Sequence, residues 1–242
     1  MKFIAVGVGP GDPELITIKA LKTIEQSDLV LVPVAAAGQL SIAESVIHAH
    51  LKVETIPIVF PMTRDEKNRD SVLLEQIKTL RPKWENAKST VLTVIGDSSL
   101  YATAAYFYVV WRELDPSIEL ELIPGVSAHS LTGSRTGRFL ALGEEIFSVI
   151  PGTANVKAIG MALKNCDSAA LYKPSALGEQ LRSVVESEGP WEDILRVDRA
   201  GLPDERIVKG VSALVSNDEY LSTLLLRRNA GIVNPSLKSG QR

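Results

Sequence analysis

The chain has 242 residues, of which 45% are hydrophobic and 23% charged, a composition typical of a globular protein with a sizeable core rather than of a disordered one. Its formal net charge of −3 at pH 7 disfavours a protein that binds nucleic acid, because neutralising phosphates requires a basic surface. Cys166 is the single cysteine, so the sequence excludes an internal disulfide and a metal site built on several thiolates.

The first predicted elements are a short apolar strand and an amphipathic helix. Phe3 to Val8 is expected to form a buried strand, and its apolar run is too short for a signal peptide. Asp12 is a suitable N-cap for a helix that continues to about Ser27, with Pro13 at the first helical position. Because no stretch approaches the length of a membrane span, we expect a soluble, cytoplasmic protein.

The rest of the first half continues this alternation of strands and helices, which predicts a mainly parallel sheet. Strands are expected at residues 29–34, 53–60, 90–95 and 118–123, the second of them interrupted by Pro57. Helices are expected at residues 41–51, 65–88 and 100–114, the second with a break near Pro82. Pro124 and Gly125 then mark a change of pattern, so the first α/β domain is expected to span residues 1–123.

A second, mixed α/β domain is expected over residues 124–230. Its helices are predicted at residues 127–137, 156–164 and 176–188, and its strands at 146–150, 169–172, 194–197, 207–215 and 220–227. The last three strands follow one another closely, and turns such as residues 216–218 favour hairpins in a mixed or antiparallel sheet. Residues 231–242 are expected to form a disordered tail.

The glycine-rich turn Gly7-Val8-Gly9-Pro10-Gly11-Asp12 follows the first strand and suggests a ligand loop. A dinucleotide-binding loop would require a third glycine at position 12, where Asp12 instead places a negative charge near the pyrophosphate. Pro10 and Pro13 also remove backbone donors from that loop. A tight turn without a ligand remains the alternative.

Two further turns repeat this arrangement at the ends of later strands. Gly96-Asp97-Ser98 follows the strand at 90–95, and Pro124-Gly125-Val126-Ser127 follows the strand at 118–123. Each taken alone could simply cap a helix. Since open α/β sheets bind ligands at the carboxyl ends of their strands, the three turns together are expected to converge on one crevice.

Together these turns resemble the tetrapyrrole methylase family. The matching segments are Gly7 to Ala20, Gly96 to Thr103 and Pro124 to Ser127, and the resemblance extends from Lys2 to about Arg228. Within the family, residues 61–65 with Trp84, residues 171–173 and residues 220–227 resemble the precorrin-2 C(20)-methyltransferase branch. The sequence departs from the family pattern at Ser98, where proline is common, and at residues 128–130, where Ser-Phe-Ser is more typical.

The resemblance implies two α/β domains with a cofactor crevice between them. It implies an S-adenosylmethionine-dependent methyl transfer to the C-20 meso carbon of precorrin-2 or cobalt-factor II in cobalamin biosynthesis, and a homodimer. S-adenosylhomocysteine would be the product, and no metal site is implied. The residues expected to contact the cofactor are Pro10, Gly96, Asp97, Ser98, Tyr101, Ala102, Thr103, Ser127, Tyr172 and Ala200.

The implied substrate is a polycarboxylate, so its binding surface should offer cations. Arg135 and Arg138 are the candidates for that contact, and residues 64, 67 and 69 form a second basic cluster. For both clusters a solvated charged face is the alternative. Asp97 and Lys173 are candidates for steering protonation of the macrocycle, whereas His129 is expected to be structural.

Three other functions remain open from the sequence. The first is a methyltransferase acting at another carbon of the corrin ring, the second a non-catalytic nucleotide-binding regulator, and the third a nicotinamide-dependent oxidoreductase. Asp12 and Pro10 count against the third.

Overall fold

The computed structural model describes residues 1–61, 63 and 65–229, and the predicted tail at 231–242 lies outside them, as does Arg64. The chain divides between Ser127 and Ala128 into two compact units. We call them the N-terminal unit and the C-terminal unit and describe each by itself. Among the described residues no helix is long and apolar enough to cross a membrane.

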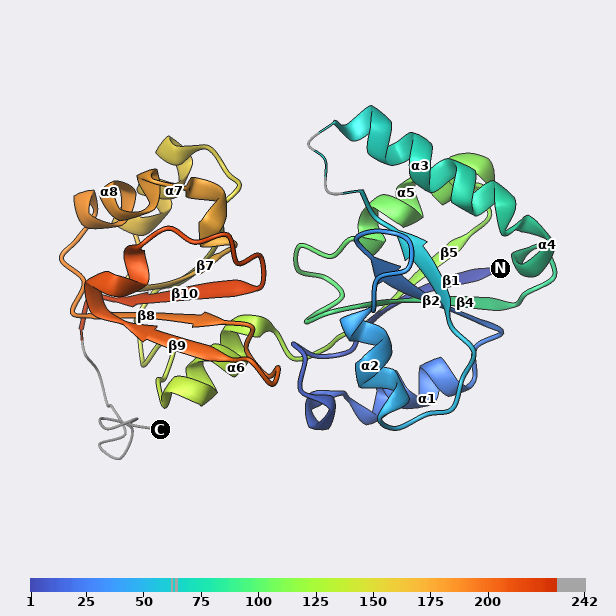
Figure 1. Ribbon diagram of the computed structural model, residues 1–242, viewed down its shortest axis with the longest axis horizontal. Helices are drawn as coiled ribbons and strands as arrows, with labels where there is room; N and C mark the ends of the chain where they lie inside the picture. The colour runs from blue at the N-terminus through green and yellow to red at the C-terminus, as the bar shows by residue number, and fades with distance from the viewer. Residues whose placement is uncertain (62, 64, 230–242) are drawn as a thin grey trace. The chain divides into compact units, whose positions relative to one another are not determined.

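The N-terminal unit is built on a parallel five-stranded sheet with the strand order β3-β2-β4-β1-β5 (Figure 1). The strands are β1 (Lys2–Gly7), β2 (Leu29–Val34), β3 (Ile56–Val59), β4 (Ser89–Val94) and β5 (Glu119–Ile123). The predicted parallel sheet is therefore confirmed. β3 is shorter than predicted, and it tolerates Pro57 because it lies at the edge of the sheet.

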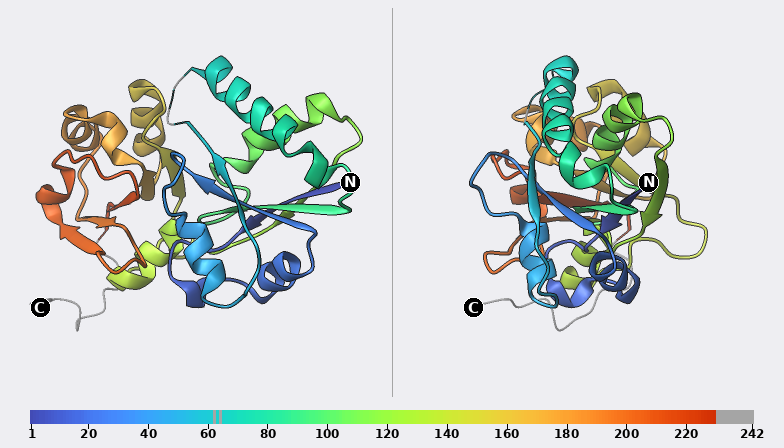
Figure 2. Two further views of the ribbon diagram at one scale, coloured as in Figure 1. Left: turned by 45° about the vertical axis from the view of Figure 1, so that its right-hand side comes forward. Right: turned by 90° about the vertical axis from the view of Figure 1, so that its right-hand side faces the viewer.

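Helices cover both faces of this sheet (Figures 1 and 2). On one face lie α3 (Glu66–Thr79), the short α4 (Arg81–Trp84) and α5 (Ala104–Leu114); on the other lie α1 (Ile18–Glu25) and α2 (Ile42–His48). Alternate residues of β1 supply the two cores, since Phe3 packs with Trp111 of α5 whereas Ile4 packs with Ile24 of α1.

Two predicted helices of this unit begin later than expected. The helix expected from Asp12 is two elements: a 3₁₀ turn, η1 (Pro13–Leu15), capped by Asp12, and then α1, capped by Thr17 Oγ1 at 3.1 Å from the amide of Ala20. The helix expected from residue 100 begins only at Ala104, because Tyr101 adopts a positive φ of 52° that no α-helix accommodates. In both cases a local cap or backbone conformation overrides the apolar period.

The C-terminal unit is built on a mixed five-stranded sheet with the order β6-β7-β10-β8-β9. The strands are β6 (Phe147–Pro151), β7 (Ser168–Tyr172), β8 (Asp193–Asp198), β9 (Arg206–Lys209) and β10 (Ser222–Arg227). β6 and β7 are parallel, and the other neighbouring pairs are antiparallel. The prediction of a mixed sheet is confirmed.

The helices of the C-terminal unit are also split between the two faces of its sheet (Figure 1). They are α6 (Ala128–Thr136), α7 (Val156–Lys164) and α8 (Gln180–Ser187). α7 and α8 bury Ile159 and Leu181 against Leu171 and Leu224 of the sheet. The opposite face carries Ala170, Leu195 and Leu225, packed against Leu140, Phe147 and Tyr172.

Three details of this unit differ from the sequence-based prediction. The helix expected at 176–188 is a 3₁₀ turn, η2 (Pro174–Leu177), followed by α8, because Gly178 interrupts it with a φ of 52°. The strand expected at 207–215 ends at Lys209 and continues as a 3₁₀ turn, η3 (Gly210–Leu214). Residues 216–218 do not close a hairpin, because β10 pairs with β7 and β8 rather than with β9.

Candidate functional site

The three glycine-rich turns of the N-terminal unit meet at the carboxyl end of its sheet. Gly9 and Gly96 form an isolated bridge, in which the amide of Gly96 donates to Gly9 O at 2.8 Å and the amide of Gly9 to Gly96 O at 3.3 Å. The backbones are so close that a Cβ on Gly7 would lie 2.6 Å from Gly96 O and 2.7 Å from the nitrogen of Gly125. Glycine is therefore required there, and the expected convergence of the turns is present within this unit.

Asp97 and Ser98 tie the second turn to the third. Asp97 Oδ2 accepts a hydrogen bond from the amide of Gly125 at 2.9 Å, and its Oδ1 accepts one from the amide of Ser99 at 2.8 Å. Ser98 is buried, and its hydroxyl donates to Ile123 O at 2.8 Å. Ser98, where the family often has proline, thus fixes the turn by a side-chain hydrogen bond to the end of β5.

Gly96 is buried, but there is open space on one side of its backbone. Its φ of 80° is accessible mainly to glycine, and a Cβ at this position would meet no heavy atom within 4 Å. Pro10, from the first turn, is buried at the same end of the sheet. This part of the turn can therefore accept the close approach of an extended ligand to the backbone.

Tyr101, Ala102 and Thr103 connect this turn to α5. Tyr101 is 46% exposed and holds a positive φ of 52°, a conformation that is uncommon for a bulky residue and recurs at ligand sites. Partial burial raises the pKa of its phenol. Ala102 packs against the core, Thr103 is the N-cap residue of α5, and Ser127 is the last residue of the unit.

In the C-terminal unit, the predicted residues Tyr172, Lys173 and Ala200 lie where β7 and β8 end, at one end of the strands of the second sheet. Tyr172 ends β7, and the amide of Lys173 donates to Ser222 O, at the start of β10, at 3.1 Å. Ser222 in turn pairs with Asp198, the last residue of β8, two positions before Ala200. The antiparallel pairing of β10 with both neighbours therefore brings together residues that are far apart in sequence.

Two non-glycine residues that follow the ends of β7 and β8 have left-handed backbone conformations. Lys173 has a φ of 53° and Arg199 a φ of 54°. Such conformations cost roughly 1–3 kcal/mol each and cluster at functional sites. Lys173 Nζ lies 4.6 Å from the centroid of the Tyr220 ring, a cation–π distance.

His129 contacts Tyr172, a relationship that sequence reasoning did not find. The backbone N–H of His129 donates to Tyr172 Oη at 3.1 Å, and its Nδ1 lies 2.8 Å from the same oxygen. The imidazole also packs 5.5 Å from the Phe147 ring. In the sequence, the departure from the family's Ser-Phe-Ser pattern at residue 129 was the signal that could have pointed to this contact. The hydrogen bonds to Tyr172 Oη agree with the structural role expected for His129.

The basic candidates for substrate contact are differently placed. Arg135 is 41% exposed at its side chain, with Nε 3.3 Å from Glu205 Oε2. Arg138 is only 13% exposed: it forms an ion pair with Asp193 through Nε, and its Nη1 donates to Thr136 O at 3.0 Å. The guanidinium of Arg138 is thus committed within the unit. Lys67 is exposed on α3, and Arg69 lies over the Tyr106 ring at 4.0 Å.

Sequence comparison places this fold in a known family. The family model of the tetrapyrrole (corrin/porphyrin) methylases matches residues 2–214. The chain belongs to this family. The turns at Gly7, Gly96 and Gly125, on which the resemblance was based, are those that the N-terminal unit brings together.

Relatives of this tetrapyrrole methylase are similar along almost their whole length. A Methanocaldococcus jannaschii protein named "Probable cobalt-precorrin-2 C(20)-methyltransferase" is 30% identical over 240 residues, 94% of this chain and 96% of its own. The cobalt-precorrin-2 C(20)-methyltransferase of Salmonella typhimurium is 28% identical over 233 residues, with the same coverage of both chains, 94% and 96%.

A solved uroporphyrin-III C-methyltransferase from Thermus thermophilus, complexed with S-adenosylhomocysteine, has the same fold. Its TM-score to this methylase is 0.68 at 20% identity, with 94% of this chain and 97% of that chain covered. At this identity the likeness establishes the fold, including the parallel sheet of the N-terminal unit and the mixed sheet of the C-terminal unit.

Proposed function

We propose that this tetrapyrrole methylase transfers a methyl group from S-adenosylmethionine to the C-20 meso carbon of precorrin-2 or cobalt-factor II in cobalamin biosynthesis. The observation that carries the proposal is the similarity to cobalt-precorrin-2 C(20)-methyltransferases over 94% of the chain. The convergence of the three glycine-rich turns of the N-terminal unit supports it, because it supplies a backbone surface that an extended ligand can approach.

The residues of the N-terminal unit suit the methionine part of the cofactor. Bound S-adenosylmethionine supplies an electrophilic methyl group, so the protein mainly has to position it and exclude water. We propose that Gly96 and the residues after it bind this part through backbone groups, with Asp97 and Ser98 fixing the loop. The contacts proposed for this unit are Pro10, Gly96, Asp97, Ser98, Tyr101, Ala102, Thr103 and Ser127.

In the C-terminal unit, Tyr172 and Ala200 are proposed to contact the adenine. The orientation of the Tyr172 hydroxyl by His129 supports this role, because it presents the ring in one fixed position. Lys173, at the same end of the strands, and Asp97 are proposed to steer protonation of the macrocycle. Arg135 is the proposed contact for a substrate carboxylate, whereas the ion pair of Arg138 with Asp193 favours a structural role for Arg138.

We also propose that the protein is cytoplasmic, does not bind nucleic acid and forms a homodimer. Exposed apolar side chains support self-association: Val109 of α5 is 56% exposed, and Leu120 and Leu122 of the edge strand β5 are each 45% exposed. Sedimentation analysis of the parent and of Val109→Glu tests it, since a monomeric parent would refute the homodimer.

The decisive experiment is a single-product assay. The enzyme is incubated with isotopically labelled S-adenosylmethionine and, in separate arms, with precorrin-2 or with preformed cobalt-factor II, and the transferred methyl is located by NMR. A label at C-20 is expected, and the comparison of the two arms decides between the two substrates. A label at C-11 would favour the activity named for a Priestia megaterium relative, a cobalt-precorrin-4 C(11)-methyltransferase that is 26% identical over 243 residues.

A further inference from the structure

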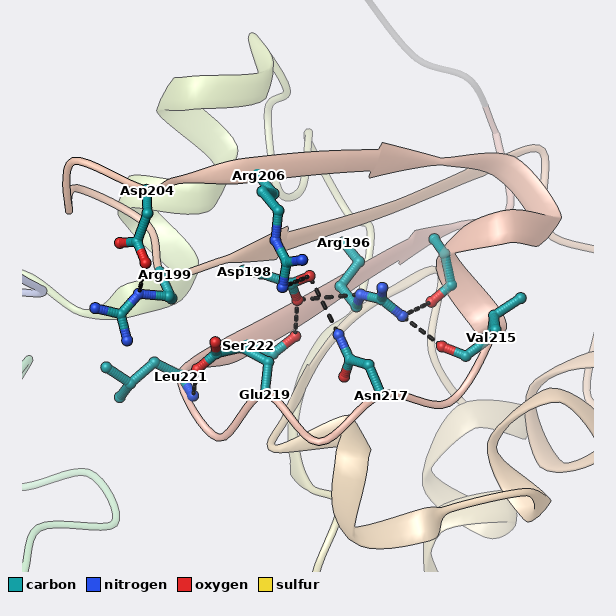
Figure 3. Close-up of polar contacts among 11 residues, drawn as sticks. Arg196, Asp198, Arg199, Asp204, Arg206, Val215, Asn217, Glu219, Leu221 and Ser222 are labelled. Atoms are coloured by element: carbon teal, nitrogen blue, oxygen red, sulfur yellow. Dashed lines mark hydrogen bonds and ion pairs between the residues drawn. The ribbon is translucent and has the colours of Figure 1, made fainter. Parts of the chain in front are cut away.

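A buried carboxylate lies at the end of β8, next to the residues proposed to contact the adenine. Asp198, the last residue of β8, is 1% exposed, and four side chains surround it (Figure 3). Ser222 Oγ donates to its Oδ1 at 2.6 Å and Asn217 Nδ2 to its Oδ2 at 3.2 Å. The Arg196 and Arg206 guanidiniums are ion-paired with it at 3.1 and 3.5 Å.

These contacts form a row across three strands. Ser222 of β10 and Arg206 of β9 are the direct cross-strand partners of Asp198 in β8, so the three side chains lie on the same face. Arg196 is two residues earlier on β8 and is also buried, and its Nη1 donates to Ala213 O at 2.9 Å and to Val215 O at 2.6 Å. The carboxylate thereby connects the ends of the three strands to the η3 turn.

The backbone next to Asp198 carries the proposed nucleoside contact. Arg199 follows with its φ of 54°, and its amide donates to Leu221 O at 2.6 Å. Ala200 comes next, and the turn is closed by Arg199 Nε at 2.6 Å from Asp204 Oδ2 and by the amide of Gly201 at 2.7 Å from Glu205 Oε2. Figure 3 shows the Arg199–Asp204 pair beside the Asp198 row.

Stability alone does not explain a charge cluster in this position. Burying an ion pair costs desolvation energy that the Coulomb attraction often only balances, and apolar residues of similar volume can be more stabilising. What such a cluster does provide is a unique geometry, because each member must find its partners. The strained Arg199 backbone needs such a constraint from its surroundings.

We propose that Asp198 is a positioning residue, which holds the Arg199–Ala200 turn and, through Ser222, the Lys173 strand end in the conformation that binds the adenosyl part of the cofactor. This rests on the proposed function. Asp198 itself does not touch the ligand. Its partners Ser222 and Asn217 act with it, and Arg196 compensates its charge.

The test compares two carboxylates of the same unit that each neutralise a buried arginine. Asp198 pairs with Arg196, whose side chain is 7% exposed, and Glu145 pairs with Arg227, whose side chain is 6% exposed. Arg227 and Ser222 are the two ends of β10, about 16 Å apart at the rise of an extended strand. Asp198→Asn and Glu145→Gln therefore each leave a buried arginine without its carboxylate, near opposite ends of β10.

Both variants should lose thermal stability, but only Asp198→Asn should bind S-adenosylhomocysteine about tenfold more weakly by calorimetry at a temperature where both are folded. In steady-state assays its KM for S-adenosylmethionine should rise. Equal losses of affinity in the two variants, or parental affinity in Asp198→Asn, would overturn the proposal.

Two milder variants cover the case in which Asp198→Asn does not fold. Ser222→Ala and Asn217→Ala each remove one hydrogen bond to Asp198 and leave every charge in place, so each should weaken S-adenosylhomocysteine binding about threefold. If both variants bind S-adenosylhomocysteine as tightly as the parent, the proposed positioning role of Asp198 is contradicted. Amide hydrogen exchange can be measured without a ligand. The exchange rate at residues 199–202 should increase in these variants and stay unchanged in Glu145→Gln. If the rate at residues 199–202 does not increase in these variants, the proposal is also overturned. If the parent bound no S-adenosylhomocysteine, the proposed function and the adenosyl contact would both be refuted, and hydrogen exchange at residues 199–202 would still decide whether Asp198 holds the turn.

Discussion

Asp97 Oδ2 accepts a hydrogen bond from the amide of Gly125 at 2.9 Å, and this contact joins the turns that follow β4 and β5. Asp97→Ala leaves that amide without its acceptor, at a cost of roughly 1–3 kcal/mol, and frees the two turns. We expect S-adenosylhomocysteine to bind about tenfold more weakly by calorimetry.

Asp115→Ala is the matched control for Asp97→Ala. Asp115 Oδ1 accepts from the amide and hydroxyl of Ser117, as Asp97 does from Ser99, but it lies in the turn before β5. Its loss should lower the melting temperature without changing affinity. Parental binding by Asp97→Ala would show that the joined turns do not shape the site.

Gly96→Ala should weaken binding of S-adenosylhomocysteine, because the added Cβ points into the space beside the turn. Gly210 is the control: its φ of 62° is also left-handed, and a Cβ there also meets nothing within 4 Å. Each substitution should cost about 1–2 kcal/mol of unfolding free energy from backbone strain, measured with urea. Only Gly96→Ala should also lose affinity by calorimetry, and an equal affinity in the two variants would place the ligand elsewhere.

Arg135→Ala and Arg138→Ala should have opposite signatures. Arg138→Ala leaves the Asp193 carboxylate, which is 15% exposed, without its partner, so the unfolding free energy should fall by about 3 kcal/mol. Arg135→Ala should unfold like the parent but raise the KM for the tetrapyrrole about tenfold, with lysine rescuing only part of the loss. An unchanged KM in Arg135→Ala would show that Arg135 lies on a solvated surface and does not contact the substrate.

Asp28→Asn tests an acid-sensitive link at the start of β4. Hydrogen bonds from the amides of Ser89 and Lys88 to Asp28 Oδ2 hold the pKa of this carboxyl below its ordinary value. A lowered pKa in the folded state stabilises the protein above the unfolded-state pKa of about 3.9, and this stabilisation is lost as the pH falls below it. The parent should therefore exceed Asp28→Asn in urea stability at pH 7, by a small margin because Asp28 is exposed, and converge with it as the pH falls through the lowered pKa of Asp28. A difference in unfolding free energy between the parent and Asp28→Asn that stays constant with pH would contradict a stabilising role of the ionised Asp28 carboxyl.

Most strands and the three glycine-rich turns were predictable from the sequence because their signals are local. β2 was predicted to the residue, since Leu29–Val34 is an apolar run bounded by polar and small residues. The parallel direction of the strands followed from the alternation of strands and helices, and this direction predicted that the turns after β1, β4 and β5 lie at one end of the sheet. The later start of α5 was not predictable, because the left-handed Tyr101 fits no periodic pattern.

By itself, the sequence determined the class of fold, the resemblance to the family, and the location of Gly96, Asp97 and Tyr172 at the ends of strands. Only the tertiary structure decided which charged side chains are buried and paired within their unit. Arg196 and Asp198 alternate along β8 as residues of a solvated face would, yet both are buried, and Arg138 is joined to Asp193 across 55 positions. The reason is physical: a strand's alternation fixes which side chains share a face, but whether that face meets solvent or another element depends on distant segments, here β9, β10 and η3.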